Sequence, residues 1–132
     1  RIIGENVWID NLAEISIGSH VCISQGALLL CGNHDFKKST FDLITRPIDL
    51  EDGVWIGANC VVAPGVTCRS HSVLSLGSVA TKDLEAWTVY QGNPATAKKP
   101  RSQNHDDSQI RLHTVHPQAS LSAAQCSRAQ TL

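Results

Sequence analysis

Apolar residues recur at a fixed spacing of six along most of this 132-residue chain. A first column of mainly aliphatic residues keeps that step over 3–29 and again over 50–80, with two extra residues between Ile9 and Ile17. A second column of mainly small or β-branched residues follows members of the first by four positions, and so precedes the next member by two wherever the step is six. Because side chains alternate across a strand, residues two apart point to the same side, so the columns predict short strands with one buried face.

A third column predicts regular corners. Three positions after the first column stand mostly residues that tolerate positive φ: Asn6, Leu12, His20, Gly26, Gly53, Asn59, Gly65, His71, Gly77 and Asp83. Gly, Asn, Asp and His adopt that conformation most readily. A corner every six residues predicts a triangular coil of three hexapeptides, and stacked coils form an all-β parallel β-helix over about residues 2–85. A β-sandwich is the alternative, but its strands do not keep a strict six-residue phase.

The repeat is interrupted by one long segment, between Leu29 and Leu50. This segment mixes polar and turn-forming residues with Phe36, Phe41 and Ile44. Long excursions from a rigid scaffold are commonly binding loops, so we expect an extruded loop at about residues 30–48. The apolar residues spaced through it predict that the loop packs down onto the coils.

Charge and composition exclude some classes of function. The formal net charge is -1, so no basic surface argues for a nucleic acid or an anionic membrane as partner. The longest apolar run, around residues 27–31, is too short to span a bilayer. Five cysteines, an odd number without a close Cys-x-x-Cys pair, argue against a disulfide framework and a zinc site. We therefore expect a protein of the reducing cytoplasm.

Both ends of the chain depart from the pattern. The chain starts at Arg1 and enters the repeat at once, so we expect it to lack its natural start. Residues 100–132 lose the repeat, and their polar, Ser/Gln-rich composition predicts disorder. The expected organisation is one β-helix domain over residues 1–99, followed by a disordered tail over 100–132.

Two stretches resemble a known family. Residues 54–95, VWIGANCVVAPGVTCRSHSVLSLGSVATKDLEAWTVYQGNPA, resemble the closing coils of bacterial hexapeptide-repeat acyltransferases. Residues 7–36, VWIDNLAEISIGSHVCISQGALLLCGNHDF, resemble their sugar O-acetyltransferase branch, most closely the colanic acid biosynthesis acetyltransferases. The resemblance implies a left-handed β-helix, a handedness that the period alone does not determine. It also implies transfer of an acetyl group from acetyl-CoA to a sugar hydroxyl, in a homotrimer whose extruded loop reaches a neighbouring subunit.

The resemblance places the catalytic histidine at His34, at the start of the interruption. Acetyl transfer to a hydroxyl needs a general base near neutral pH, and imidazole titrates in that range. A surface histidine without a role is the alternative for any single His. Cys31, three residues away, is an alternative nucleophile in a Cys–His pair, although the family works by direct transfer.

The resemblance also assigns the remaining site positions. The residues expected to contact acetyl-CoA are Trp55, Ala58, Leu76, Thr81 and Lys82, and those expected to contact the acceptor are Asp10, Asn11 and Asn33. Trp55 either covers the pantetheine arm or packs beneath the loop. Leu76 stands where a small residue is usual, which would narrow the groove. Lys82 suits a phosphate but is also a common type of surface residue.

Two other functions remain open on this scaffold. A γ-type carbonic anhydrase needs three histidines around zinc, two of them close in sequence. The repeats contain His20, His34 and His71 without that spacing, so we expect no metal. His20 and His71 fall on the corner column, where we expect solvated turns. The third reading is an inactive or truncated β-helix that only assembles.

Overall fold

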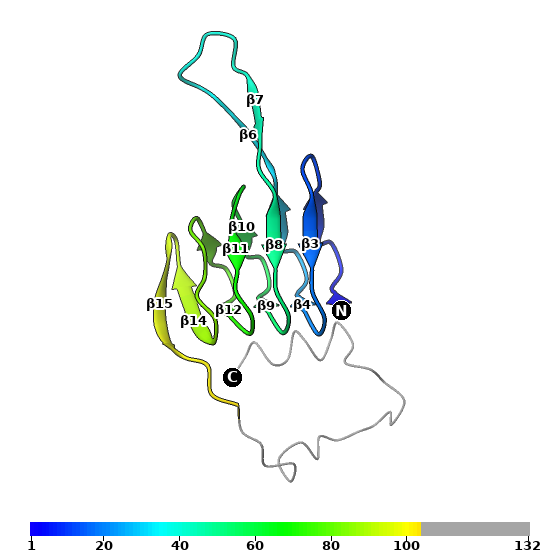
Figure 1. Ribbon diagram of the computed structural model, residues 1–132, viewed down its shortest axis with the longest axis vertical. Coiled ribbons are helices and arrows are strands. Elements are labelled where there is room, and N and C mark those ends of the chain that lie inside the picture. The colour runs from blue at the N-terminus through cyan, green and yellow to red at the C-terminus, as the bar shows by residue number, and fades with distance from the viewer. Residues whose placement is uncertain (104–132) are drawn as a thin grey trace.

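The computed structural model, which describes residues 1–103, has the predicted parallel β-helix with three walls (Figure 1). The first wall holds β1 (Ile2–Ile3), β4 (Cys22–Ile23), β9 (Trp55–Ile56), β12 (Val73–Leu74) and β14 (Thr88–Gly92). The second holds β2 (Trp8–Asp10), β5 (Leu28–Leu30), β10 (Val61–Val62) and β13 (Val79–Ala80). The third holds β3 (Ile15–Ile17), β8 (Ile48–Leu50) and β11 (Thr67–Cys68). Neighbours within each wall pair in parallel, so successive coils stack directly on one another.

The two apolar columns form the core, as predicted. From Ile23 to Ala80, every member of the first column is 0% exposed. The second column is equally buried from Val21 to Leu84, whose exposed fractions are 1% and 2%. Ile3, in the first coil, is 48% exposed, because one side of that coil has no neighbouring coil among the described residues.

The corner column is confirmed at most positions. Positive φ angles occur at Asn6, His20, Gly26, Gly53, Asn59, Gly65, His71 and Gly77. The prediction is wrong at Leu12 and Asp83. Leu12 lies in the step that carries two extra residues, so this corner has a different length. At Asp83 the side chain, rather than a positive φ, links the corner to the neighbouring coil. Its Oδ1 accepts a hydrogen bond from the Thr67 N–H at 2.8 Å.

The interruption is an antiparallel hairpin that stands away from the coils, formed by β6 (Gly32–His34) and β7 (Leu43–Thr45) (Figure 1). It leaves after β5 and returns at β8, close to the predicted bounds of 30–48. The expectation that it packs down is wrong, since Phe36 is 78% and Phe41 54% exposed. The two strands pair with each other, so beyond its base the hairpin does not need the coils for its hydrogen bonds.

The described chain continues past the predicted end of the β-helix near residue 85. β14 extends the first wall, and β15 (Ala95–Pro100) folds back against it in antiparallel fashion. Of the predicted tail, Pro100 ends β15 and the Arg101 N–H donates to the Trp87 carbonyl at 2.7 Å. Residues 104–132, on which the rest of that prediction falls, lie outside the described residues.

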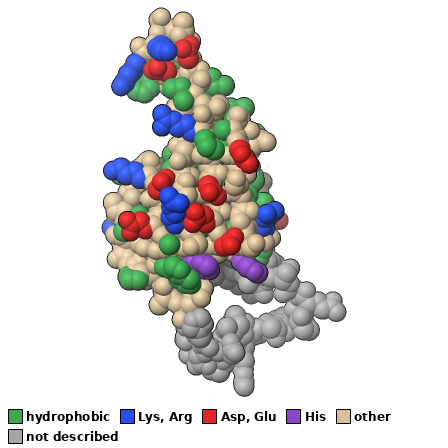
Figure 2. Space-filling model, viewed as in Figure 1, with side chains coloured by type: hydrophobic (Ala, Val, Ile, Leu, Met, Phe, Trp, Pro, Cys, Tyr) green, Lys and Arg blue, Asp and Glu red, His purple; other side chains and the backbone are tan. Residues whose placement is uncertain are grey.

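The walls carry charges of both signs. Figure 2 shows acidic and basic side chains interspersed over the face formed by β3, β8 and β11, with hydrophobic side chains on the projecting hairpin. Within residues 1–103 we find no helix that could cross a membrane.

Candidate active site

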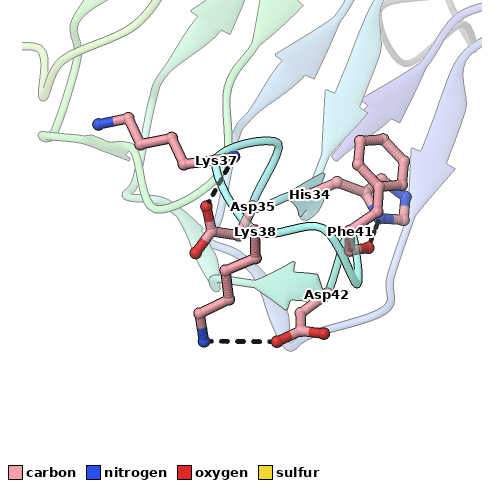
Figure 3. A network of polar contacts seen from close by, with 6 residues as sticks. All are labelled: His34, Asp35, Lys37, Lys38, Phe41 and Asp42. Atoms are coloured by element: carbon pink, nitrogen blue, oxygen red, sulfur yellow. Dashed lines mark hydrogen bonds and ion pairs between the residues drawn. The ribbon is translucent and has the colours of Figure 1, made fainter.

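His34 lies at the end of β6, where the hairpin leaves the coils, and its side chain is exposed. Its Nδ1 is 3.0 Å from the Phe41 carbonyl oxygen (Figure 3). A carbonyl oxygen only accepts hydrogen bonds, so Nδ1 is the protonated nitrogen of this pair. In the neutral ring, Nε2 then keeps a free lone pair, which is the arrangement that a general base requires.

Phe41 holds the same ring by a second contact. Its phenyl ring stacks on the imidazole with centroids 4.2 Å apart and planes 3° from parallel. Phe41 has a φ of 50°, in the left-handed region that bulky residues rarely enter. Sequence reasoning missed this role, because nothing in residue type marks a phenylalanine for positive φ.

The structure brings two of the three expected acceptor residues to the base of the hairpin. The Asp10 Oδ2 accepts from the Gly32 N–H at 3.3 Å, and the Asn33 Oδ1 accepts from the His34 N–H at 2.8 Å. Gly32 leaves room for these side chains, since an added Cβ would lie 2.9 Å from Leu12 Cδ1 and 3.1 Å from Asp10 Oδ2. Asn11 is exposed beside Asp10, directly after β2.

Two of the residues expected to contact acetyl-CoA line a groove on the first wall. Its volume is ≈ 540 Å³, and its lining includes Trp55, Leu76, Lys98, Lys99 and Arg101. The Trp55 Nε1–H donates to the Ser24 Oγ at 3.1 Å. Trp55 therefore does not pack beneath the hairpin, which emerges between the other two walls. No column of the repeat marks the basic residues of β15 or Arg101, because they lie beyond the last regular hexapeptide.

The other expected coenzyme contacts lie elsewhere. Thr81 and Lys82 are exposed directly after β13, at the end of the second wall. The carbonyl of Ala58 accepts from the Gly77 N–H at 2.8 Å, at a corner between coils. None of the three lines the groove, and neither does His34. Within one chain, the groove at Trp55 lies on the first wall, whereas His34, like Thr81 and Lys82, follows a strand of the second wall.

The three free cysteines within residues 1–103 do not offer a nucleophile comparable with His34. Cys31 is 0% exposed, whereas the His34 ring is exposed and bound to Phe41. Burial raises the pKa of the Cys68 thiol to about 12, and Asp83 and Asp49 add to the effect. Burial also raises the pKa of Cys60. Because the thiolate is the reactive form, these two thiols are inert in the folded chain.

The remaining histidines differ from each other. His20 is an exposed corner residue with a φ of 57°, as expected. The expectation of a solvated turn is wrong for His71, whose ring stacks on Trp87 and whose Nδ1 is buried without a partner within residues 1–103. In that part of the chain, no three His, Cys, Asp or Glu side chains lie close enough to share a metal ion.

The comparisons with known proteins point to acetyltransferases. No protein-family model matches the chain. The chain is 36% identical over 99 residues to a protein named as a colanic acid biosynthesis acetyltransferase, WcaF, of Escherichia coli K12. It is 33% identical over 92 residues to the galactoside O-acetyltransferase of the same organism. The alignments cover 75% and 70% of this chain but 54% and 40% of the relatives, so the chain spans about half the length of the curated relatives it matches.

Solved structures give the same picture. The hexapeptide-repeat acetyltransferase VCA0836 of Vibrio cholerae, in complex with acetyl coenzyme A, superposes with a TM-score of 0.70 at 33% identity, over 76% of this chain and 60% of that one. A galactoside acetyltransferase in complex with coenzyme A gives 0.69 at 28% identity, over 76% and 55%. The predicted left-handed β-helix is confirmed. The resemblance of the chain to the hexapeptide-repeat acyltransferases is confirmed with it.

Proposed function

We propose that this chain transfers an acetyl group from acetyl-CoA to a hydroxyl of a sugar or polysaccharide precursor, with His34 as the general base. The observation that carries the proposal is the hydrogen bond from His34 Nδ1 to the Phe41 carbonyl, which leaves Nε2 free on an exposed ring. The proposal is supported by relatives named as O-acetyltransferases and by neighbours in complex with acetyl-CoA or CoA. We propose the cytoplasm as the location, on the same cysteine pattern that led us to expect a reducing compartment.

The reaction needs no covalent enzyme intermediate. His34 Nε2 takes the proton of the acceptor hydroxyl, and the resulting alkoxide attacks the thioester carbonyl carbon. A backbone N–H stabilises the oxyanion. The C–S bond then breaks, and the departing thiolate takes the proton from the imidazolium. Holding acceptor and thioester side by side supplies much of the barrier reduction. Asp10, Asn11 and Asn33 are the candidates for orienting the acceptor beside His34.

We further propose that the active form is a homotrimer with acetyl-CoA between two subunits. The groove at Trp55 and the base His34 lie on different walls of one chain, so a second subunit is needed to bring them together. The hairpin exposes Phe36 at 78% and Leu43 at 55%, which offers apolar surface for a neighbouring copy. We propose that Ala58, Leu76, Thr81 and Lys82 complete the coenzyme site.

The activity is tested by thiol release from acetyl-CoA against a panel of acceptor sugars, with binding of acetyl-CoA followed by calorimetry. The chain should bind acetyl-CoA with saturable heat, and His34→Ala should lose transfer while keeping that heat. His20→Ala is the matched control, because His20 is also an exposed histidine at the edge of a coil. A chain that binds no acetyl-CoA and acetylates no acceptor would be the inactive scaffold.

The intersubunit site is tested by mixing inactive partners. His34→Ala and Trp55→Ala chains, co-expressed with different tags and purified through both, should regain part of the activity that each lacks alone. Restoration requires that a base from one subunit meets a groove from another. Sedimentation of the wild-type chain should give a trimer, and a stable, active monomer would contradict the assembly.

A further inference from the structure

We propose that Phe41 is a positioning residue that holds His34 in the Nδ1–H tautomer through its carbonyl and in a fixed ring orientation through its phenyl group. The inference rests on the proposed role of His34 as a base. It adds a residue that neither the repeat nor the family motifs indicate. Figure 3 shows both contacts on one side of the hairpin, with the two rings face to face.

The first contact depends on the backbone conformation of Phe41. Its φ of 50° lies in the left-handed region, and its carbonyl meets His34 Nδ1 at 3.0 Å. Two backbone hydrogen bonds close the turn that precedes Phe41. The Phe41 N–H donates to the Lys38 carbonyl at 3.0 Å, and the Lys38 N–H donates to the Asp35 carbonyl at 3.2 Å. A bulky residue in this conformation is strained, and such residues cluster where function requires a particular geometry.

The second contact is the ring stack, and core packing does not explain it. Phe41 is 54% exposed, so its side chain is not held by the coils. Its ring nevertheless lies 3° from parallel to the imidazole, at a centroid distance of 4.2 Å. Aromatic stacking of this kind shifts a population by about 2- to 10-fold. The Phe41 ring therefore restricts rotation of the His34 imidazole. Without that rotation, Nδ1 stays at the Phe41 carbonyl and Nε2 stays turned toward the acceptor.

The experiment separates the ring from the turn. Phe41→Asn and Phe41→Gly both remove the ring and keep residues that adopt positive φ readily, so the turn should persist. Phe41→Tyr keeps the ring and is the conservative rescue. Phe36→Ala is the matched control, because it removes a 78% exposed phenyl group from the same hairpin.

Two measurements are made on each variant. The imidazole nitrogen shifts of His34, observed by NMR at the alkaline plateau of a pH titration, report the tautomer directly. Steady-state kinetics report kcat and KM for acetyl-CoA. We expect an Nδ1–H signature in the wild type, Phe41→Tyr and Phe36→Ala. We expect mixed tautomers in both ringless variants, with kcat lowered about 2- to 10-fold and KM unchanged.

The proposal is overturned if the ringless variants keep the wild-type nitrogen shifts and kcat, or if Phe36→Ala changes them as much as Phe41→Asn does. The tautomer measurement does not depend on catalysis. If His34→Ala retained turnover, the proposed function would fail, and the nitrogen shifts would still decide whether Phe41 holds the ring.

Discussion

Two histidines in this structure stack on aromatic rings with nearly the same geometry, and they face opposite environments. His34 and Phe41 have centroids 4.2 Å apart and planes at 3°, and His71 and Trp87 have 4.2 Å and 6°. Both aromatic residues have positive φ, 50° and 56°. His34 Nδ1 has a carbonyl partner and an exposed ring, whereas His71 Nδ1 is buried and unpaired within residues 1–103. Aromatic stacking alone therefore does not make a histidine a general base. The exposure and hydrogen-bond partners of its ring nitrogens determine whether it can act as one.

The His71 stack is part of the packing between coils. Its ring lies over Gly53 in the coil below, where an added Cβ would overlap the imidazole. Arg101 closes the same corner, since one guanidinium nitrogen donates to the Gly53 carbonyl at 2.8 Å and to the His71 carbonyl at 3.1 Å. Burial lowers the pKa of Arg101 below its ordinary value. This histidine joins three coils and the end of β15, and no substrate can reach its Nδ1.

The largest expected effect separates the two histidines by activity. His34→Ala should lower kcat by roughly 10²–10⁴-fold with acetyl-CoA affinity nearly unchanged, because general-base catalysis is lost while the coenzyme groove stays intact. His71→Ala should keep most of the turnover and lower the free energy of unfolding instead. Kinetics and urea unfolding of both variants check the contrast. Equal loss of activity in the two would refute the division of roles.

The next effect concerns the space above Gly53. Gly53→Ala should cost about 2–4 kcal/mol of unfolding free energy, because the residue has positive φ and the new methyl group would displace the His71 ring. Gly77→Ala is the matched control, since Gly77 has a φ of +69° with no atom within 4 Å of the added Cβ. Its cost should be about 1–2 kcal/mol from the backbone alone. Chemical denaturation measures both, and equal costs would show that His71 does not constrain this corner.

A smaller effect is expected at Arg101. Arg101→Gln should lower the unfolding free energy by about 1–2 kcal/mol, because it removes a charge-assisted hydrogen bond to two carbonyls at the His71 corner. Lys99→Gln, an exposed change on β15, should leave stability within about 0.5 kcal/mol. Thermal and urea unfolding compare the two. If Arg101→Gln changed the unfolding free energy no more than Lys99→Gln does, the corner at His71 would not depend on the Arg101 hydrogen bonds.

The smallest expected effect tests the buried thiol at the base of the hairpin. Cys31→Ala should leave most of the acetyl transfer intact, since Cys31 is fully buried and no acyl-enzyme is part of the mechanism. Removing its sulfur from the core should cost about 1 kcal/mol of stability. Turnover and unfolding of the same preparation measure both quantities. An inactive but folded Cys31→Ala chain would favour the Cys–His pair over the general base.

Sequence patterns predicted the coils well because each position repeats the same physical environment. An inward residue such as Leu50 meets other inward residues one coil above and below, so its burial follows from the period. The corners at His20 and Gly77 follow from residue type. Residue type did not predict the Asp83 corner, because the Asp83 side chain, rather than a positive φ, forms the hydrogen bond to Thr67.

Candidate-site residues were predictable where the break in the repeat or a family motif marks them. His34 could be singled out because it lies in the interruption and matches the family motif, but its partner Phe41 depends on a turn that no column specifies. The extruded loop was predicted, but the expectation that it packs down was wrong, because apolar residues spaced through a loop can be exposed as well as buried. Trp87 and Arg101 lie beyond the last regular hexapeptide, so their meeting with His71 had no periodic signal.

The way the hairpin joins the coils has a consequence for how such a chain can change. The segment leaves after Leu30 and re-enters at Ile48, and the Arg46 N–H closes its base on the Cys31 carbonyl at 3.0 Å. The register of the coils on either side does not depend on how many residues lie between these points, and doubling a loop's length costs only about 0.6 kcal/mol. Insertions, deletions or substitutions near the tip, at residues 35–42, therefore do not alter how the core residues of the coils pack. One scaffold can thus present many different hairpins, and acceptor preference can diversify independently of folding.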